Sequence, residues 1–148
     1  MAIYFYTTGS DYGCFSNFSR HGVELDGEYW PTTEHYFQAQ KFPATADCDK
    51  IRHAKTPKDA AKMGRDRSRP LRQDWEQVKD DIMRKAVLRK FGTHPEIREI
   101  LLATGEEEIV ENSPIDYYWG CGKDGSGKNR LGQILMEVRE ILRKRTPE

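Results

Sequence analysis

A carboxylate and an amine lie seven residues apart in one aromatic segment of the chain. Residues 30–42 read WPTTEHYFQAQKF, and in a helix Glu34, Gln38 and Lys41 stand at i, i+4 and i+7 on one face. Glu34 can activate a nucleophile or stabilise a cationic sugar transition state, and a partly desolvated Lys41 can act as an amine nucleophile or proton donor. The alternative is a solvated Glu and Lys on an amphipathic helix, which these residues taken alone favour.

A glycine-rich loop, from Trp119 to Asn129, lies near the end of the chain. Gly120, Gly122 and Gly125 have the spacing of a dinucleotide fingerprint, and residues 122–129 differ from a P-loop at one position. We reject both matches, because the preceding segment is short and aromatic and because Asn129 replaces the hydroxyl that holds magnesium. Glycines still let backbone N–H groups crowd together before an electropositive helix start, so the loop can hold a phosphate or diphosphate. A flexible turn is the alternative.

Positive charge is concentrated in one part of a neutral chain. Nine basic and two acidic residues lie between Lys50 and Arg72, whereas the whole protein has 24 of each sign. Such a local excess can attract a phosphate-bearing ligand, and Arg65, where a helix should end, can turn its guanidinium toward phosphate oxygens. A solvated basic face is the more common meaning of such a run.

Two tryptophans can stack on a flat heterocycle, a contact worth ~1–3 kcal/mol per base. Trp119 lies beside the glycine loop and is the better candidate. Trp75 has helical spacing with Val78 and Ile82, which by itself indicates core packing.

The elements that position these residues follow from patterning. Residues 3–7 alternate as a strand, and Asp26-Gly27 separates two short strand segments as a hairpin turn would, so we expect a small sheet at the amino end. Thr32 is expected to cap a helix over residues 33–42, and Thr56 a helix that begins with Pro57.

The second half of the chain is mostly helical in pattern. Apolar residues at helical spacing predict a long helix from Trp75 to about Phe91, and a short helix should run from Pro95 to Gly105. Residues 108–111 resemble a brief strand. A final amphipathic helix is expected after Asn129, which is placed to cap it, with its apolar face formed by Leu131, Leu135, Val138 and Leu142. We therefore expect one compact, mostly helical α+β domain with a small β-sheet over residues 1–148.

Composition excludes several classes of protein. The chain has 148 residues, of which 36% are hydrophobic and 32% charged, as in a soluble single domain. Its apolar runs are far shorter than the ~18 residues needed to cross a bilayer, and its first residues lack the basic start of a signal peptide. Three cysteines, without a Cys-x-x-Cys pair, indicate reduced thiols in the cytoplasm and no metal site.

Several motifs, in order along nearly the whole chain, together resemble the NADAR family. They are residues 15–18 (FSNF), residues 30–42, Gly64-Arg65, Asp74-Trp75, and residues 119–132 with the glycine loop, Asn129 and Leu131-Gly132. The closer resemblance is to the single-domain bacterial members, which are N-glycosidases of riboflavin-biosynthesis intermediates.

The resemblance implies hydrolysis of a bond between ribose and the nitrogen of an amino-heterocycle, without a metal or organic cofactor. In one branch the substrates are phosphorylated ribosylaminopyrimidines, which release ribose 5-phosphate. In another branch the enzyme removes ADP-ribose from modified guanine in nucleic acid, which zero net charge mildly disfavours. A non-catalytic module that binds ADP-ribose or NAD is a third interpretation. No membrane partner is expected, and the sequence leaves the oligomeric state open.

The resemblance also suggests which residues form the site. Glu34 and Lys41 are expected to be catalytic, with Glu34 as acid and base and Lys41 either donating a proton or attacking C1′. The residues expected to bind substrate are Asn17, Arg65, Asp74, Trp75, Asp116, Trp119, Gly120, Gly122 and Asn129. Within this set, the two tryptophans line the base pocket, and Arg65 grips the phosphate together with the loop from Gly122 to Asn129.

Overall fold

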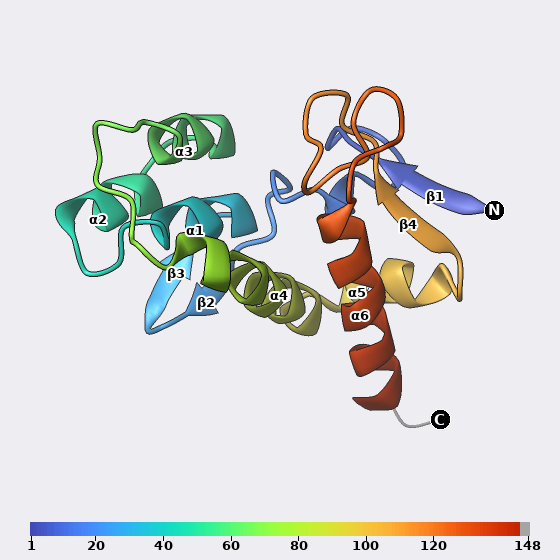
Figure 1. The fold of residues 1–148 in the computed structure, drawn as a ribbon. Helices are drawn as coiled ribbons and strands as arrows, with labels where there is room; N and C mark the ends of the chain where they lie inside the picture. The colour runs from blue at the N-terminus through green and yellow to red at the C-terminus, as the bar shows by residue number, and fades with distance from the viewer. Residues whose placement is uncertain (146–148) are drawn as a thin grey trace. The chain divides into compact units, whose positions relative to one another are not determined.

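A computed structural model describes residues 1–145 of the chain. Over this range the elements follow one another as β1 (Ala2–Phe5), the 3-10 helix η1 (Gly13–Phe15), β2 (Val23–Leu25), β3 (Glu28–Trp30), α1 (Thr33–Ala39), α2 (Ala46–Arg52), α3 (Pro57–Gly64), α4 (Trp75–Thr93), α5 (Pro95–Ala103), β4 (Glu108–Glu111) and α6 (Arg130–Arg145) (Figure 1). The fold class is α+β and mostly helical, as predicted.

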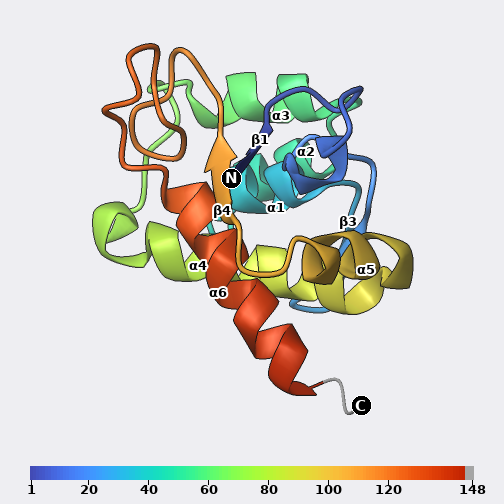
Figure 2. The ribbon, with the colours of Figure 1, turned by 90° about the vertical axis from the view of Figure 1, so that its right-hand side faces the viewer.

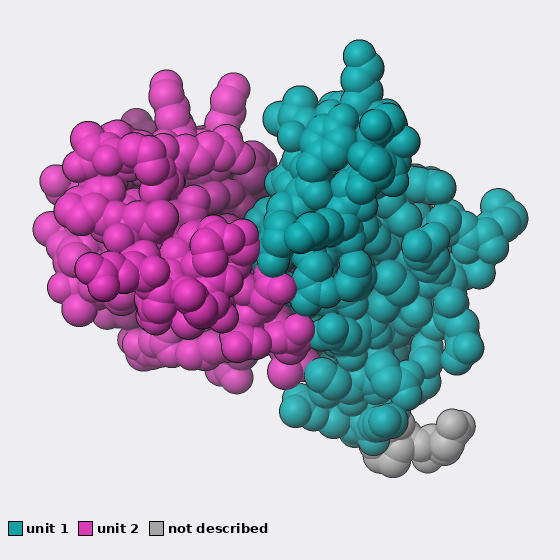
Figure 3. Space-filling view, in the orientation of Figure 1, with its two compact units in different colours: residues 1–16, 91–148 teal, residues 17–90 magenta. Residues whose placement is uncertain are grey.

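The chain divides into two compact units: residues 17–90, and residues 1–16 together with those from Phe91 onward (Figure 3). That all 148 residues make one domain stays a prediction.

The hairpin predicted around Asp26-Gly27 is confirmed in the unit of residues 17–90. β2 and β3 pair antiparallel with Val23 opposite Trp30. Asp26 and Gly27 have φ of 57° and 80°, the left-handed conformations that a two-residue type I′ turn requires. Trp30 is 3% exposed, and its indole N–H donates to the carbonyl of Leu25 at 3.0 Å.

Three short helices, α1, α2 and α3, follow the hairpin, and each begins in the same way. The hydroxyls of Thr32, Thr45 and Thr56 accept hydrogen bonds from the backbone N–H three residues later, which satisfies a donor that the helix cannot pair internally. The caps at Thr32 and Thr56 were predicted. α2 was not predicted, although Thr45 gives the same signal, because seven residues are too few for a clear apolar period.

α1 ends at Ala39, three residues before the expected end. The N–H of Lys41 donates to Gln38 and that of Phe42 to Ala39, so the chain leaves the helix through tighter i→i+3 turns. Lys41 therefore lies just beyond the helix that carries Glu34 and Gln38.

The long helix predicted from Trp75 is confirmed as α4. Trp75 is 6% exposed and Ala86 and Phe91 are fully buried, as the helical spacing indicated. The boundary between the two units falls within α4, after Lys90.

The first strand lies in the other unit and does not join the hairpin. β1 pairs in parallel with β4, with Ala2 opposite Glu108 and Phe5 opposite Glu111 (Figures 1 and 2). The single sheet expected at the amino end is therefore wrong, because the described residues form two separate two-stranded sheets. Strand patterning shows where a strand is, but it does not show which distant strand will pair with it.

α6 packs against β4 and completes the core of this unit. Ile109 on the strand and Ile134, Leu135 and Val138 on the helix are all fully buried. α5 ends as predicted before Gly105, which has a φ of 65°. Across residues 1–145, no helix combines the length and the apolar character needed to cross a membrane.

Candidate active site

Glu34 and Gln38 lie one turn apart on α1, and both side chains are buried. Glu34 is 7% exposed and Gln38 is 4% exposed. The Gln38 amide Nε2 donates to Glu34 Oε2 at 2.8 Å. The alternative of a solvated surface pair is therefore wrong, since a carboxylate removed from water in this way needs compensating contacts.

Asn17 fixes the first turn of the same helix. Its carbonyl accepts from the N–H of Glu34 at 3.1 Å, and its Oδ1 accepts from the Thr33 hydroxyl at 2.8 Å. Its Nδ2 lies 3.2 Å from the sulfur of Met83 on α4. These contacts give Asn17 a role in positioning Glu34, while contact with substrate stays a prediction.

The amine of Lys41 is held in the same unit, beyond the end of α1. Lys41 is 8% exposed, and its Nζ donates to the carbonyl of Gly64 at 3.3 Å. Burial, with a smaller effect from the positive charge of Arg67, lowers the pKa of Lys41 from 10.5 to about 8, while Glu34 opposes the shift. About one amine in ten is then neutral at pH 7, against about one in three thousand for a solvated lysine.

Trp75, the first residue of α4, forms one side of this amine site. The Lys41 Nζ lies 5.7 Å from the centre of the Trp75 ring, a cation–π distance, and Phe37 packs against the same ring with 5.1 Å between centroids. The core and site interpretations of Trp75 are thus compatible, because the ring is buried and also contacts the amine.

Arg72 connects Trp75 to the chain around Lys41. The N–H of Arg72 donates to the Lys41 carbonyl at 3.1 Å, and its guanidinium donates to the Gln40 carbonyl at 3.2 Å. Asp74 accepts from the same guanidinium at 2.6 and 3.1 Å. Asp74 thereby supports the segment that carries Trp75, and its predicted contact with substrate is a separate matter that stays a prediction.

The turn after α3 brings two further cations close to the amine. Arg65 is the C-cap of α3, so the helix ends where it was predicted to end. Arg67 donates to the Gly64 carbonyl at 2.6 Å and to the Arg65 carbonyl at 3.2 Å. Both arginines are exposed and both contribute to the lowered pKa of Lys41, so this turn carries the positive charge that a phosphate group needs.

The close approach of Gln38 explains why α3 ends in a glycine, Gly64. A Cβ at this position would overlap the Oε1 atom of Gln38, so only glycine leaves room for that carboxamide.

The predicted site lacks three residues that the structure places there: Gln38, Gly64 and Arg67. Gln38 was placed on the correct face, but no pattern in the sequence connects it with Gly64, which lies two helices later.

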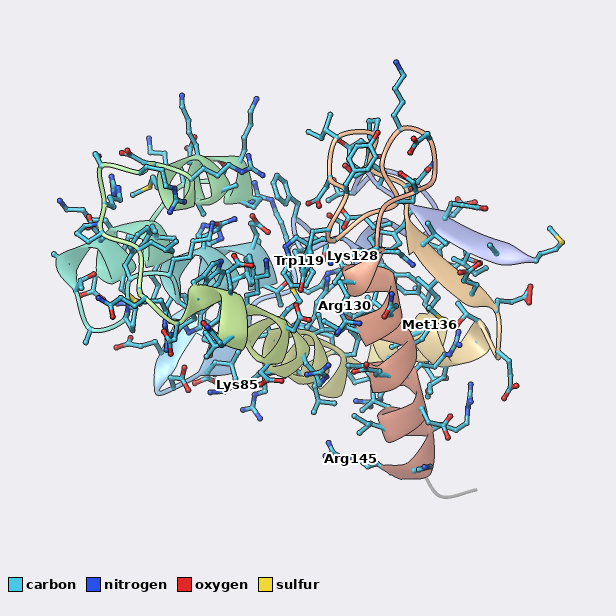
Figure 4. All side chains as sticks on the ribbon, viewed as in Figure 1. Lys85, Trp119, Lys128, Arg130, Met136 and Arg145 are labelled. Atoms are coloured by element: carbon cyan, nitrogen blue, oxygen red, sulfur yellow. The ribbon has the colours of Figure 1, made fainter. Side chains whose placement is uncertain are left out.

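The other predicted residues lie in the unit that contains β4 and α6, within the loop from residue 112 to Asn129. Asp116 Oδ1 accepts from the N–H groups of Tyr118 and Trp119 at 2.9 and 2.8 Å, which fixes the turn that carries the indole. Trp119 packs edge-to-face on Tyr118, next to the start of α6 (Figure 4). A Cβ on Gly120 would come within 2.9 Å of the Glu111 carbonyl, so this glycine permits close backbone packing.

One expectation about this loop is wrong, and the hydrogen bonds of the loop bear on a second. Asn129 does not cap α6 with its side chain, because Oδ1 accepts from the N–H of Glu111 and Nδ2 donates to Ile109, each at 2.9 Å. Five backbone N–H groups at the end of the loop bond to carbonyls of the loop itself; the donors are Gly127, Lys128, Asn129, Arg130 and Leu131. These donors are occupied within the loop, while phosphate binding by the loop as a whole stays a prediction.

This loop also borders a cavity of about 430 Å³ within its own unit. Gly122, Lys123, Lys128 and Asn129 line it from the loop, and Tyr4 lines it from β1. Gly122 has a φ of 73° and would meet the Tyr117 ring if it carried a Cβ. Among residues 1–145, no three His, Cys, Asp or Glu side chains come together as a metal site requires.

Comparison with known proteins gives a consistent family. The NADAR domain matches residues 4–143. An N-glycosidase of Nostoc punctiforme is 55% identical over 97% of this chain and 94% of its own. The N-glycosidase YbiA of Escherichia coli is 54% identical over 95% of this chain and 88% of its own. The NMR structure of YbiA superposes with a TM-score of 0.90, at 53% identity, over 97% of this chain and 86% of that chain. The chain is also 44% identical to 25% of a maize chloroplastic riboflavin biosynthesis protein.

Proposed function

The chain belongs to the NADAR family and is an N-glycosidase, and from this premise we propose that it cleaves phosphorylated ribosylaminopyrimidines of riboflavin biosynthesis. Hydrolysis of the ribose–nitrogen bond releases ribose 5-phosphate and the aminopyrimidine. The name of the maize relative supports this substrate class. The proposed setting is the cytoplasm, where the cysteines at positions 14, 48 and 121, none of which forms a disulfide within residues 1–145, stay reduced.

One observation carries the proposal: a buried amine with a pKa of about 8 lies in the same unit as a buried carboxylate that influences its charge. Breaking a ribose–nitrogen bond builds positive charge at C1′ and negative charge on the leaving nitrogen. Glu34 can supply a proton to the leaving nitrogen and then stabilise the cationic sugar. Lys41 can supply either a proton or an electron pair.

The lowered pKa of Lys41 favours nucleophilic attack by its nitrogen on C1′ over proton donation. The Nζ lone pair forms a bond to C1′ as the C1′–nitrogen bond breaks, and protonated Glu34 gives its proton to the departing nitrogen. The new C1′-bound amine returns one proton to the Glu34 carboxylate. Glu34 then protonates the ring oxygen, the C1′–O bond opens, and a protonated Schiff base joins Lys41 to the open sugar.

Water completes the reaction and restores both side chains. Glu34 takes a proton from water as its oxygen bonds to C1′, and then returns that proton to the Lys41 nitrogen. As the C1′–nitrogen bond breaks, Glu34 takes the remaining proton of the new hydroxyl, so the sugar leaves as the aldehyde and Glu34 is protonated again. The net change is addition of one water molecule across the original glycosidic bond. Arg65 and the neighbouring positive charge after α3 are proposed to bind the 5-phosphate.

The test is incubation of the purified protein with ribosylaminopyrimidine phosphate while release of ribose 5-phosphate is measured. Reduction with borohydride during turnover should add the mass of an open ribose phosphate to Lys41. Folded Lys41→Ala and Glu34→Gln proteins should lose nearly all activity, whereas Lys144→Ala, an exposed lysine on α6, should match the parent. Parent-rate cleavage by either site variant overturns the proposal.

A second candidate is removal of ADP-ribose from modified guanine in nucleic acid. The observation in its favour is the exposed basic surface of α3 and the following turn, which includes Lys58, Lys62, Arg65 and Arg67. ADP-ribosylated guanine DNA, incubated in parallel, separates the two: release of ADP-ribose alone selects this branch, and release of ribose 5-phosphate alone selects the first. Binding without release from either substrate would instead support the non-catalytic module.

A further inference from the structure

Gln38 has one end of its carboxamide satisfied and the other end open. The side chain is 4% exposed, and its Nε2 donates to Glu34 Oε2 at 2.8 Å. Its Oε1 is buried and has no hydrogen-bond partner among residues 1–145. Buried carbonyl oxygens in proteins are normally paired, so a buried acceptor that is left open at an enzyme site calls for a donor from outside the chain.

The open oxygen lies beside Gly64, at the opposite end of the carboxamide from Glu34. Nε2 faces Glu34, while Oε1 lies against Gly64, where a Cβ would collide with it. The carbonyl of Gly64 in turn accepts from the Lys41 amine at 3.3 Å. The carboxamide therefore connects the carboxylate with the glycine that holds the amine.

We propose that Gln38 is a substrate-contacting residue whose Oε1 accepts a hydrogen bond from the 2-hydroxyl of the ribose. The assignment rests on the proposed function, in which Glu34 and Lys41 both act at C1′. The 2-hydroxyl is on the adjacent carbon, so it is the sugar hydroxyl closest to the atom at which both groups act, and Gln38 contacts both Glu34 and the glycine that binds Lys41. Neither heterocycle stacking nor phosphate binding would use this oxygen.

The contact has a catalytic consequence. Positive charge that develops at C1′ makes the neighbouring hydroxyl a stronger donor, so its bond to Oε1 strengthens in the transition state. Polarisation of the carboxamide also strengthens its Nε2–H bond to Glu34, because hydrogen bonds in a chain reinforce one another. Gln38 thus couples recognition of ribose to the orientation of the acid.

The experiment compares ribosyl and 2-deoxyribosyl forms of the aminopyrimidine phosphate with the parent protein and with Gln38→Met. The measured quantity is the ratio of kcat/KM for the two substrates, because their different intrinsic reactivity then cancels between proteins. Loss of one buried hydrogen bond predicts that this ratio falls about tenfold in Gln38→Met. Gln77→Met, the same change at an exposed position of α4, should keep the parent ratio.

A second variant guards against a folding defect. Gln38→Asn retains a carboxamide but withdraws it by one methylene, so it should lower the ratio as Gln38→Met does. An unchanged ratio in either folded variant overturns the assignment, even if overall activity falls. A parent protein that cleaves neither substrate would instead refute the proposed function on which the assignment rests.

Discussion

The Nζ atom of Lys41 lies 5.7 Å from the centre of the Trp75 ring, so the amine is held against an aromatic face as well as a backbone carbonyl. A ring face stabilises the ammonium form, whereas burial disfavours it. Burial is the larger influence, since the pKa falls to about 8. The amine can therefore change its charge within the physiological range.

Activity should depend on pH through this amine. The proposed attack needs Lys41 neutral and Glu34 protonated, so the pair must hold one proton. The pair loses that proton near the Lys41 pKa of about 8, so kcat should be level from pH 6 to 7 and fall about tenfold per pH unit above pH 8. Glu34→Gln has no acid to keep protonated, so its residual activity should instead rise with pH until Lys41 is neutral. Initial rates from pH 5.5 to 9.5 measure both effects. A parent rate that keeps rising between pH 8 and 9.5 would contradict the shared proton.

Replacing Lys41 should make the protein more stable at neutral pH. Below pH 8 both the folded and unfolded states carry the proton, and the folded state bears the full cost of the buried ammonium. Between pH 8 and 10.5 the folded state releases it first, so the free energy of unfolding rises with pH. Lys41→Met should therefore gain up to about 3 kcal/mol at pH 7, and less at pH 10.

Urea unfolding at the two pH values measures this gain, with Lys58→Met as the control. Lys58 is exposed on α3, so its replacement should change the free energy of unfolding by less than about 0.5 kcal/mol. A Lys41→Met protein that is less stable than the parent at pH 7 would show that the contacts of the amine outweigh its burial.

Gly64→Ala should damage the site although alanine usually favours helices. The new Cβ would collide with Gln38 Oε1 and displace the carboxamide that bonds to Glu34. We expect kcat to fall at least about tenfold and the free energy of unfolding to fall by about 1–3 kcal/mol. Gly92→Ala is the matched control, because its Cβ would meet no atom within 4 Å and should stabilise α4 by about 0.5–1 kcal/mol. Equal behaviour of the two variants in activity and thermal unfolding would refute the collision.

Asn129→Gly should weaken the unit that contains β4. The change removes the two side-chain bonds to Glu111 and Ile109, while glycine keeps the φ of 53° without strain. Loss of both bonds predicts a decrease of about 1–3 kcal/mol in the free energy of unfolding, measured by denaturant titration. If stability is unchanged but KM rises, Asn129 acts on substrate and not on the strand.

Local signals in the sequence correctly located most of the elements but not their long-range partners. The caps at Thr32 and Thr56 and the turn at Asp26-Gly27 depend on neighbouring residues, so a reader of the sequence can find them. The parallel pairing of β1 with β4 depends on residues more than a hundred positions away, and no local pattern encodes it.

The same distinction holds for the site. Glu34 and Lys41 were found because their types and spacing suggest chemistry. Gly64 was part of a recognised motif, but its function became visible only when its carbonyl was found beside Lys41 and its missing Cβ beside Gln38. Burial of both charged groups depends on tertiary packing, which is why the sequence alone favoured a solvated pair.

The pairing of Ala2 with Glu108 also constrains how the protein can form during synthesis. At about 5–20 residues per second, the first strand is synthesised roughly 5–20 s before its partner. During that interval its backbone donors and acceptors can bond to water, to another molecule or to other parts of the nascent chain, but not to β4. Residues 17–90 are all synthesised before β4. The unit that holds Glu34 and Lys41 can therefore fold before the first strand has its partner strand.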